Sequence, residues 1–187
     1  VYEVKVELTA TERMGVHRYT YYQAMNQQKY TAKVIIDLNH RDKLISHGME
    51  QLDERRIGGW RQSKAWANNQ WVYFTMEFDH EIARIVTSQD GKQAIVEFDF
   101  QRSDGERSNP VKLETLVGIS FTDAKGARGN LIYEKDMAVI RAEAKGAVNF
   151  DACRAQAKDA WNQELSKIKV TSDYEAQAFR VGAESAK

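Results

Sequence analysis

The residues best suited to chemistry lie in one short segment, between Gly58 and Trp71. Three of the four tryptophans fall within it, interleaved with Arg, Gln, Ser and Asn side chains. Aromatic rings stack on the C–H faces of sugars, while amide and guanidinium groups hydrogen-bond hydroxyls in fixed directions. A few fixed polar groups among aromatic rings is the usual composition of a small-ligand site. The segment indicates either such a site, or tryptophans in the core with amides in turns.

Other catalytic and metal-binding patterns are weak. No two histidines have the i, i+4 spacing of a helical metal site, and the single cysteine, Cys153, lies among small residues as a core residue would. His40 and His47 are expected in a solvated polar loop, whereas His17 is either structural or pocket-lining. Neither a phosphate-binding loop nor a G-x-S-x-G nucleophile motif occurs in the sequence.

The elements that must position these residues begin as strands. Alternating apolar and charged residues predict a half-buried strand at the start of the chain, with Val4, Val6 and Leu8 on its apolar face. Asp90 and Gly91 indicate a hairpin turn. Further strands are predicted at residues 15–22, 32–38, 71–78, 94–100 and 111–121.

Helices follow the strands. Small polar residues predict a short helix over Asp123–Leu131, and spacings of three and four predict a longer one over Phe150–Ile168, capped by Asn149 or Asp151. Residues 171–187 are expected to be a linker or a frayed end. Strands first and helices last predict a mainly β fold, an antiparallel β-sandwich with C-terminal helices.

Composition limits the partners. The 187 residues carry 27 Lys and Arg against 27 Asp and Glu, so the net charge is zero, which argues against nucleic acid or an anionic membrane held by bulk charge. No apolar run is long enough to span a membrane. The chain starts without Met and inside an alternating pattern, so we expect it to be part of a longer protein.

Four ordered segments together resemble glycoside hydrolase family 92, the bacterial calcium-dependent α-mannosidases. The stretch from Glu7 to Tyr19 is similar to the family's ELTAT-x-R-x-G-x-HRY, and Gly59–Phe74 to its GWR-x-S-x-x-WA-x-x-Q-x-VYF. Residues 34–40 and several segments between 117 and 168 agree in the same order. The resemblance runs from Val4 to about Val170.

The resemblance implies a supersandwich-like N-terminal domain over residues 1–148, and a helix and linker over 149–187 leading to an (α/α)6-barrel domain outside this chain. It implies an exo-acting, inverting enzyme that removes terminal α-linked mannose, often α-1,2, from glycans, with calcium contacting the sugar. The catalytic acid, the base and most calcium ligands would belong to the barrel, so neither catalytic residues nor metal ligands are assigned here. Family members are typically exported to the periplasm or cell surface.

On this chain, the sandwich's part of the sugar pocket is assigned by the resemblance to six residues: Trp60, Arg61, Ser63, Trp66, His17 and Arg18. Alternatively, Arg61 and Trp66 only join the two domains. Two other functions stay open, a non-catalytic carbohydrate-binding module and a purely structural interaction domain. Exposed aromatic rings beside a concave face would favour binding, and buried rings would favour a scaffold.

Overall fold

The computed structural model describes residues 3–141 and 148–168. The chain forms two compact units, Val1–Ala157 and Lys158–Lys187. The strands are β1 (Val4–Ala10), β2 (Met14–Tyr21), β3 (Lys29–Asp37), β4 (Lys43–Gln51), β5 (Arg56–Lys64), β6 (Gln70–Phe78), β7 (Arg84–Thr87), β8 (Gln93–Gln101) and β9 (Val111–Ser120). The helices are η1 (Tyr22–Ala24), η2 (Asp104–Glu106), α1 (Ala124–Arg141) and α2 (Phe150–Leu165).

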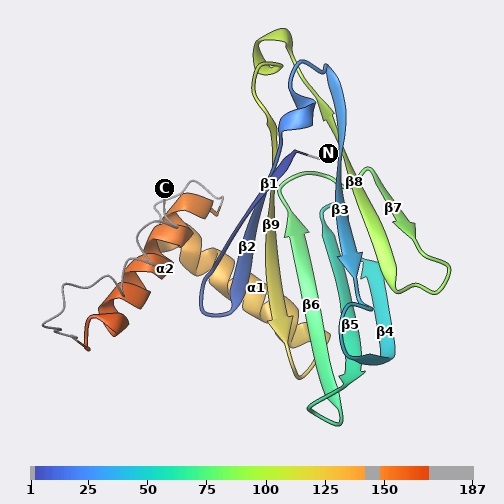
Figure 1. The fold of residues 1–187 in the computed structure, drawn as a ribbon, viewed down its shortest axis with the longest axis vertical. Helices are drawn as coiled ribbons and strands as arrows, with labels where there is room; N and C mark the ends of the chain where they lie inside the picture. Colours follow the sequence, from blue (N-terminus) through green and yellow to red (C-terminus); the bar gives the residue numbers. More distant parts are fainter. Residues whose placement is uncertain (1–2, 142–147, 169–187) are drawn as a thin grey trace, which may run out of the picture. The chain divides into compact units, whose positions relative to one another are not determined.

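The strands form two antiparallel sheets, which confirms the predicted fold class (Figure 1). Sheet A has six strands in the order β1-β2-β9-β6-β5-β4, and sheet B has three in the order β3-β8-β7. The predicted Asp-Gly turn joins β7 to β8, with Gly91 at φ 67°, a left-handed conformation that glycine adopts without strain.

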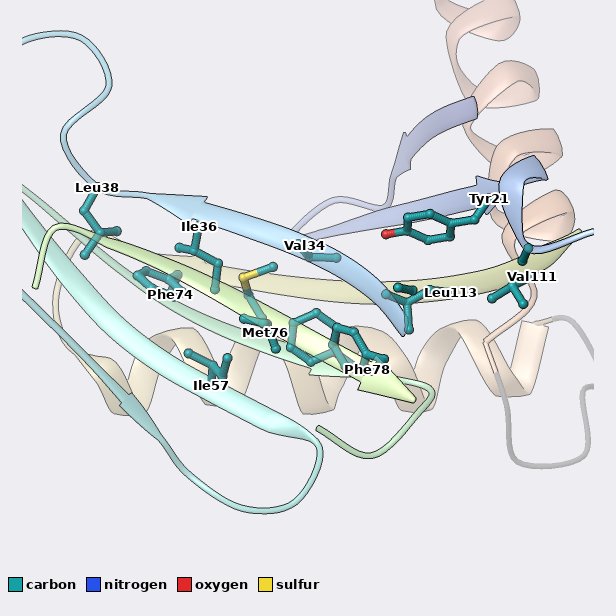
Figure 2. Close-up of a cluster of buried hydrophobic side chains, with 14 residues drawn as sticks. Tyr21, Val34, Ile36, Leu38, Ile57, Phe74, Met76, Phe78, Val111 and Leu113 are labelled. Carbon is teal, nitrogen blue, oxygen red and sulfur yellow. The ribbon is translucent and has the colours of Figure 1, made fainter. Parts of the chain in front are cut away.

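Sheet B packs on part of one face of sheet A, which we call the inner face. Alternate residues of β3, namely Ala32, Val34 and Ile36, point into this layer. Figure 2 shows Val34 and Ile36 among core side chains of sheet A such as Met76 and Phe78. Phe98 of β8 belongs to the same core, and its ring centroid lies 4.8 Å from that of Phe78. The period of two in the sequence thus produces the buried core directly.

Helix α1 packs on the opposite, outer face of sheet A, against β9 and β6. A second buried cluster lies on this face and includes Met14, Val16, Leu131, Phe150 and Cys153. The prediction that Cys153 is a core residue is therefore confirmed. The start of α2 is capped as predicted, since the Ala152 N–H donates to Asn149 Oδ1 at 3.1 Å.

Three local predictions are wrong. His47 lies on β4 rather than in a loop, because polar residues 43–51 pair with β5 at the edge of sheet A, where exposure makes apolar alternation unnecessary. Val6 and Leu8 are 53% and 64% exposed, because sheet B does not cover β1. The helix predicted over 123–131 continues to Arg141. The linker predicted at 171–187 lies outside the described residues.

Candidate functional site

Several chain reversals meet at one end of sheet A, the lower end in Figure 1. The strand register places the β1–β2 hairpin beside the turn that follows β9, since Met14 pairs with Gly118. The start of β6 adjoins the same turn, because Tyr73 pairs with Ser120, and the β5–β6 loop follows. Of the six predicted site residues, Arg61 and Ser63 lie on the inner face, and Trp66 lies in the β5–β6 loop. His17 and Trp60 line two separate cavities, and Arg18 lies at neither of them.

A cavity of about 690 Å³ opens between the β1–β2 hairpin and the β9–α1 turn, and we call it the His17 cavity. Its apolar wall is formed by side chains of β9 and the following turn, including Val117, Ile119 and the 63% exposed Phe121. Its polar groups include His17 and Asn130. An apolar wall with a few convergent polar groups is the usual composition of a ligand pocket.

His17 lies partly buried on β2, beside this cavity. Burial lowers the pKa of its imidazole below the ordinary value, so the neutral form prevails. The Nδ1 atom lies 3.0 Å from the hydroxyl of Tyr19, whose pKa burial raises. A neutral imidazole offers one donor and one acceptor, of which this contact uses one. The other nitrogen, Nε2, lies over Gly15 at the cavity wall and suits an uncharged hydroxyl ligand.

Trp60 lines a different, smaller cavity of about 300 Å³ on the outer face, between β5 and the first turns of α1, which we call the Trp60 cavity. One side of the indole covers Gly48 on β4, where an added Cβ would fall within the ring. Gly48 therefore allows the indole to lie against the sheet as a fixed platform. Lys125 and Arg128 of α1 also line this cavity.

The neighbouring aromatic residues extend this outer surface. Tyr73 is paired with Trp60 in the register, and its ring stacks on that of Trp71 with centroids 5.9 Å apart and planes 11° apart. Gln62 Nε2 donates to Asn69 Oδ1 at 2.9 Å beside them. Trp66, in the loop between β5 and β6, is fully exposed. Trp60, Gln62, Trp71 and Tyr73 thus share the outer face of β5 and β6.

Arg61 and Ser63 lie on the inner face instead, since neighbouring residues of a strand point to opposite faces. Ser63 is buried, and Arg61 Nη2 donates to the carbonyl oxygen of Arg41. Arg41 and Asp42 both have left-handed φ angles near 60°, which non-glycine residues rarely adopt. Arg61 therefore stabilises the β3–β4 connection, and its Nε is buried without a hydrogen-bond partner among the described residues.

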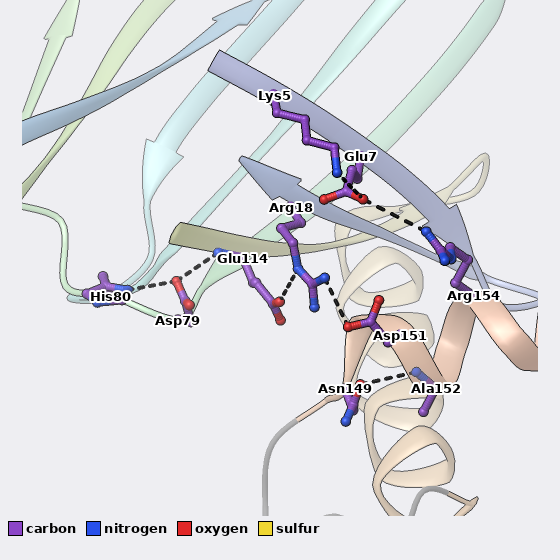
Figure 3. Close-up of polar contacts among 10 residues, drawn as sticks. All are labelled: Lys5, Glu7, Arg18, Asp79, His80, Glu114, Asn149, Asp151, Ala152 and Arg154. Atoms are coloured by element: carbon purple, nitrogen blue, oxygen red, sulfur yellow. Dashed lines mark hydrogen bonds and ion pairs between the residues drawn. The ribbon is translucent and has the colours of Figure 1, made fainter. Parts of the chain in front are cut away.

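Arg18 lies on the outer face beneath α2, in an internal network (Figure 3). Its Nε donates to Glu114 at 2.8 Å and its Nη1 to Asp151 at 3.1 Å. The guanidinium also lies 4.4 Å from the ring centroid of Phe150. Arg18 thus fixes the first turn of α2 to sheet A. Its contact with a substrate stays a prediction.

The structure separates the six predicted residues into distinct locations. His17 and Trp60 lie on opposite faces, on strands that β9 and β6 separate, which corresponds to about 14 Å across the sheet. Phe121 and Asn130, which line the His17 cavity, were not proposed from the sequence. In the sequence, Phe121 ends a predicted strand, and Asn130 with Leu131 belongs to a segment that resembles the family. Neither position by itself indicated a ligand contact.

The comparisons with known proteins agree with this geometry. A sequence model of the glycosyl hydrolase family 92 N-terminal domain matches residues 1–158. The chain belongs to this family. The resemblance seen in the sequence is thereby confirmed, and the GH92 N-terminal domain here is the two-sheet sandwich with its outer helices.

Solved structures share this fold. The GH92 α-mannosidase BT3965 from Bacteroides thetaiotaomicron matches with a TM-score of 0.67 and 23% identity, over 92% of this chain and 23% of that chain. Its complex with mannoimidazole gives 0.66 and 23% identity, over 92% and 22%. The GH92 family glycosyl hydrolase ccman5 gives 0.61 and 16% identity, over 90% and 22%. This GH92 domain therefore spans less than a quarter of these chains, and no curated protein matches it.

Two further findings concern the described part of the chain. None of its helices combines the length and apolar character needed to cross a lipid bilayer. No group of three or more His, Cys, Asp or Glu residues in 3–141 and 148–168 comes together in a way that could hold a metal ion.

Proposed function

We propose that this chain is the N-terminal domain of an exo-acting, inverting, calcium-dependent α-mannosidase that trims mannose, α-1,2-linked in particular, from glycans. The observation that carries the proposal is family membership over residues 1–158. The domain supplies the scaffold and part of the sugar pocket. Residues 1–148 form the sandwich, and 149–187 lead toward an (α/α)6-barrel domain that holds the catalytic groups. The protein is exported by a bacterium to the periplasm or cell surface.

The residues of this domain bind and orient the sugar in this proposal. The neutral His17 imidazole exchanges hydrogen bonds with a hydroxyl inside its cavity, next to the exposed ring of Phe121. Trp60 presents an indole held flat over Gly48, which suits stacking on a sugar face. Trp66, fully exposed in the β5–β6 loop, is available to contact the glycan or the following domain.

The bond-breaking step belongs to the barrel. Inversion requires one carboxylic acid to protonate the leaving oxygen and a carboxylate ~6.5–9.5 Å away to activate water. The described residues of this chain do not fit a calcium site, since no cluster of candidate ligands forms among them. In this proposal the calcium ligands lie in the barrel domain of the longer protein.

The test is hydrolysis of α-1,2-mannobiose by this chain, with calcium and then with a chelator. We expect no mannose release from protein that circular dichroism shows to be folded. A fusion to the barrel domain of a GH92 enzyme should restore release. Calcium-dependent release by the chain alone would place the acid and base within these residues and contradict the assignment of chemistry to a separate domain.

A carbohydrate-binding module is the second candidate, and the exposure of Trp66 with the open Trp60 platform favours it over a pure scaffold. This function predicts that the isolated chain binds mannose oligosaccharides. Titration calorimetry should then show loss of binding in Trp60→Ala and Trp66→Ala. Trp161→Ala is the matched control, because Trp161 lies on α2 and is 68% exposed. A purely structural domain would bind no sugar in any of these forms.

A further inference from the structure

Two side chains beside the His17 cavity share a hydrogen bond whose direction decides what the cavity offers to a ligand. His17 and Tyr19 are two residues apart on β2, so both side chains lie on the inner face of sheet A. The Tyr19 hydroxyl oxygen lies 3.0 Å from His17 Nδ1. The two rings meet edge to face, at 80° and with centroids 6.0 Å apart. A hydroxyl and a neutral imidazole nitrogen can each donate or accept, so the surroundings select the donor.

The neighbours of Tyr19 favour the hydroxyl as donor. Across the sheet, Tyr19 pairs with Val6 of β1 and with Leu113 of β9, and both are apolar. Within residues 3–141 and 148–168, the bond to His17 is the one hydrogen bond that the Tyr19 hydroxyl makes. If His17 Nδ1 donated, the O–H of this partly buried tyrosine would have no acceptor among these residues, which costs free energy. Donation from the hydroxyl to Nδ1 uses both groups.

The chemistry of the two groups favours the same direction. A phenol O–H is a stronger donor than the N–H of a neutral imidazole, and an unprotonated imidazole nitrogen is a stronger acceptor than a phenol oxygen. Burial lowers the pKa of His17 and raises the pKa of Tyr19. Burial thus favours an imidazole that keeps a lone pair and a phenol that keeps its hydrogen.

We propose that Tyr19 is a positioning residue, which donates its hydrogen to Nδ1 and so fixes the His17 tautomer that carries its own hydrogen on Nε2. Nε2 lies 3.4 Å from a Cβ built at Gly15, and Gly15 and His17 both line the cavity. This inference rests on the proposed function, which places a sugar in the His17 cavity, and adds the direction of the contact and the residue that sets it.

The fixed tautomer determines which ligand groups the cavity accepts. An Nε2–H group is a donor, so it binds an oxygen atom that can accept, such as a hydroxyl, ether or ring oxygen of an uncharged sugar. An ammonium group of an amino sugar only donates, and gains nothing from this contact. Without Tyr19, the imidazole can carry its hydrogen on either nitrogen, and only a fraction of the molecules would present the donor.

The first test is nitrogen-15 NMR of this chain at neutral pH without sugar, because long-range proton–nitrogen spectra distinguish a protonated imidazole nitrogen from an unprotonated one. Comparison with His17→Gln assigns the His17 signals. We expect a protonated Nε2 and an unprotonated Nδ1. In Tyr19→Phe both tautomers should be populated, so the two nitrogen shifts should move toward each other. Tyr21→Phe is the matched control, because Tyr21 lies on the same strand and face but its hydroxyl donates to the Lys33 carbonyl at 2.9 Å. It should leave the His17 shifts unchanged.

The second test adds methyl α-mannoside to the same samples. The sugar should shift the Nε2 signal of His17. Tyr19→Phe should weaken binding by about twofold if the two tautomers become equally populated, because affinity falls with the fraction of the competent form. Tyr21→Phe should bind as the wild type does, and circular dichroism should be the same for all three proteins.

The outcomes separate this inference from the proposed function. A wild-type spectrum with the hydrogen on Nδ1, or His17 shifts that Tyr19→Phe leaves in place, would overturn the role of Tyr19 even if the sugar binds. The expected tautomer with no response to the mannoside would overturn the sugar contact of His17, and with it that part of the proposed function.

Discussion

Gly118 sets how closely α1 approaches sheet A, and its replacement gives the sharpest test of the outer layer. A Cβ built at Gly118 would lie 2.7 Å from Leu131 Cβ and 2.9 Å from Leu131 N, and closer still to the Ala127 carbonyl oxygen. Carbon atoms in contact are normally about 3.5–4.0 Å apart, so Gly118→Ala must move α1 outward by roughly 0.8 Å. The obstacle is mostly backbone, which cannot rotate away.

The displacement has a cost that can be measured. Overpacking of this kind typically costs about 1–3 kcal/mol, and Gly118→Ala belongs at the upper end because both Ala127 and Leu131 are fully buried. For a domain of this size, about 3 kcal/mol corresponds to a fall of about 6–12 °C in melting temperature. Asn130, whose Nδ2 donates to the Ile119 carbonyl at 2.8 Å, would move with the helix and widen the His17 cavity.

The assay is thermal unfolding followed by circular dichroism, with urea titration as a second measure. Gly129→Ala is the matched control, because it lies in the same helix with nothing within 4 Å of its added Cβ. Replacing this helical glycine should stabilise the protein by about 0.5–1 kcal/mol. If Gly118→Ala melted within a degree of the wild type, α1 would not rest on β9 as described, and the reasoning would fail.

Two further outcomes are expected. Gly48→Ala should displace the Trp60 indole from β4 and weaken sugar binding by the isolated chain, while circular dichroism stays unchanged; undiminished binding would show that the platform is not used. Arg84 and Lys33 lower the pKa of Glu97 to about 2, from an ordinary value of 4.5. The ion pairs of Glu97 with Arg84 and Lys33 therefore stabilise the folded state fully above pH 4.5, and this stabilisation is lost as the pH falls toward 2. The melting temperature should decline over this window, and it should decline less in Glu97→Gln.

The sequence predicted the architecture because the core depends on local periodicity. Alternation marked most of the strands, and the helical spacing after Asn149 marked α2 with its cap. Four short segments in the family's order were enough to identify the family from the sequence. Strands β4, β5 and β7 were not predicted. The side chains of β4 and β7, at the edges of their sheets, are mostly exposed, and exposed positions carry no hydrophobic pattern. In β5, Gly58 and Gly59 interrupt the alternation of apolar and polar residues.

The site was predicted less completely, because ligand surfaces depend on which strands are neighbours. Trp60 and Arg61 are adjacent in the sequence and were assigned to one pocket. On β5 they point to opposite faces, Trp60 toward α1 and Arg61 toward the β3–β4 connection. Phe121 and Asn130 reach the His17 cavity only because β9 and α1 pack beside the β1–β2 hairpin.

The sequence by itself determined the mainly β sandwich and its membership of the GH92 N-terminal domain family, since these follow from the period and the order of motifs along the chain. Only the tertiary structure decided which residues meet. It placed Arg18 beneath the first turn of α2, and it placed Trp60 and Arg61 on opposite faces of β5. The physical reason is that the sheet order joins strands far apart in the chain, and side chains on a strand alternate between two faces.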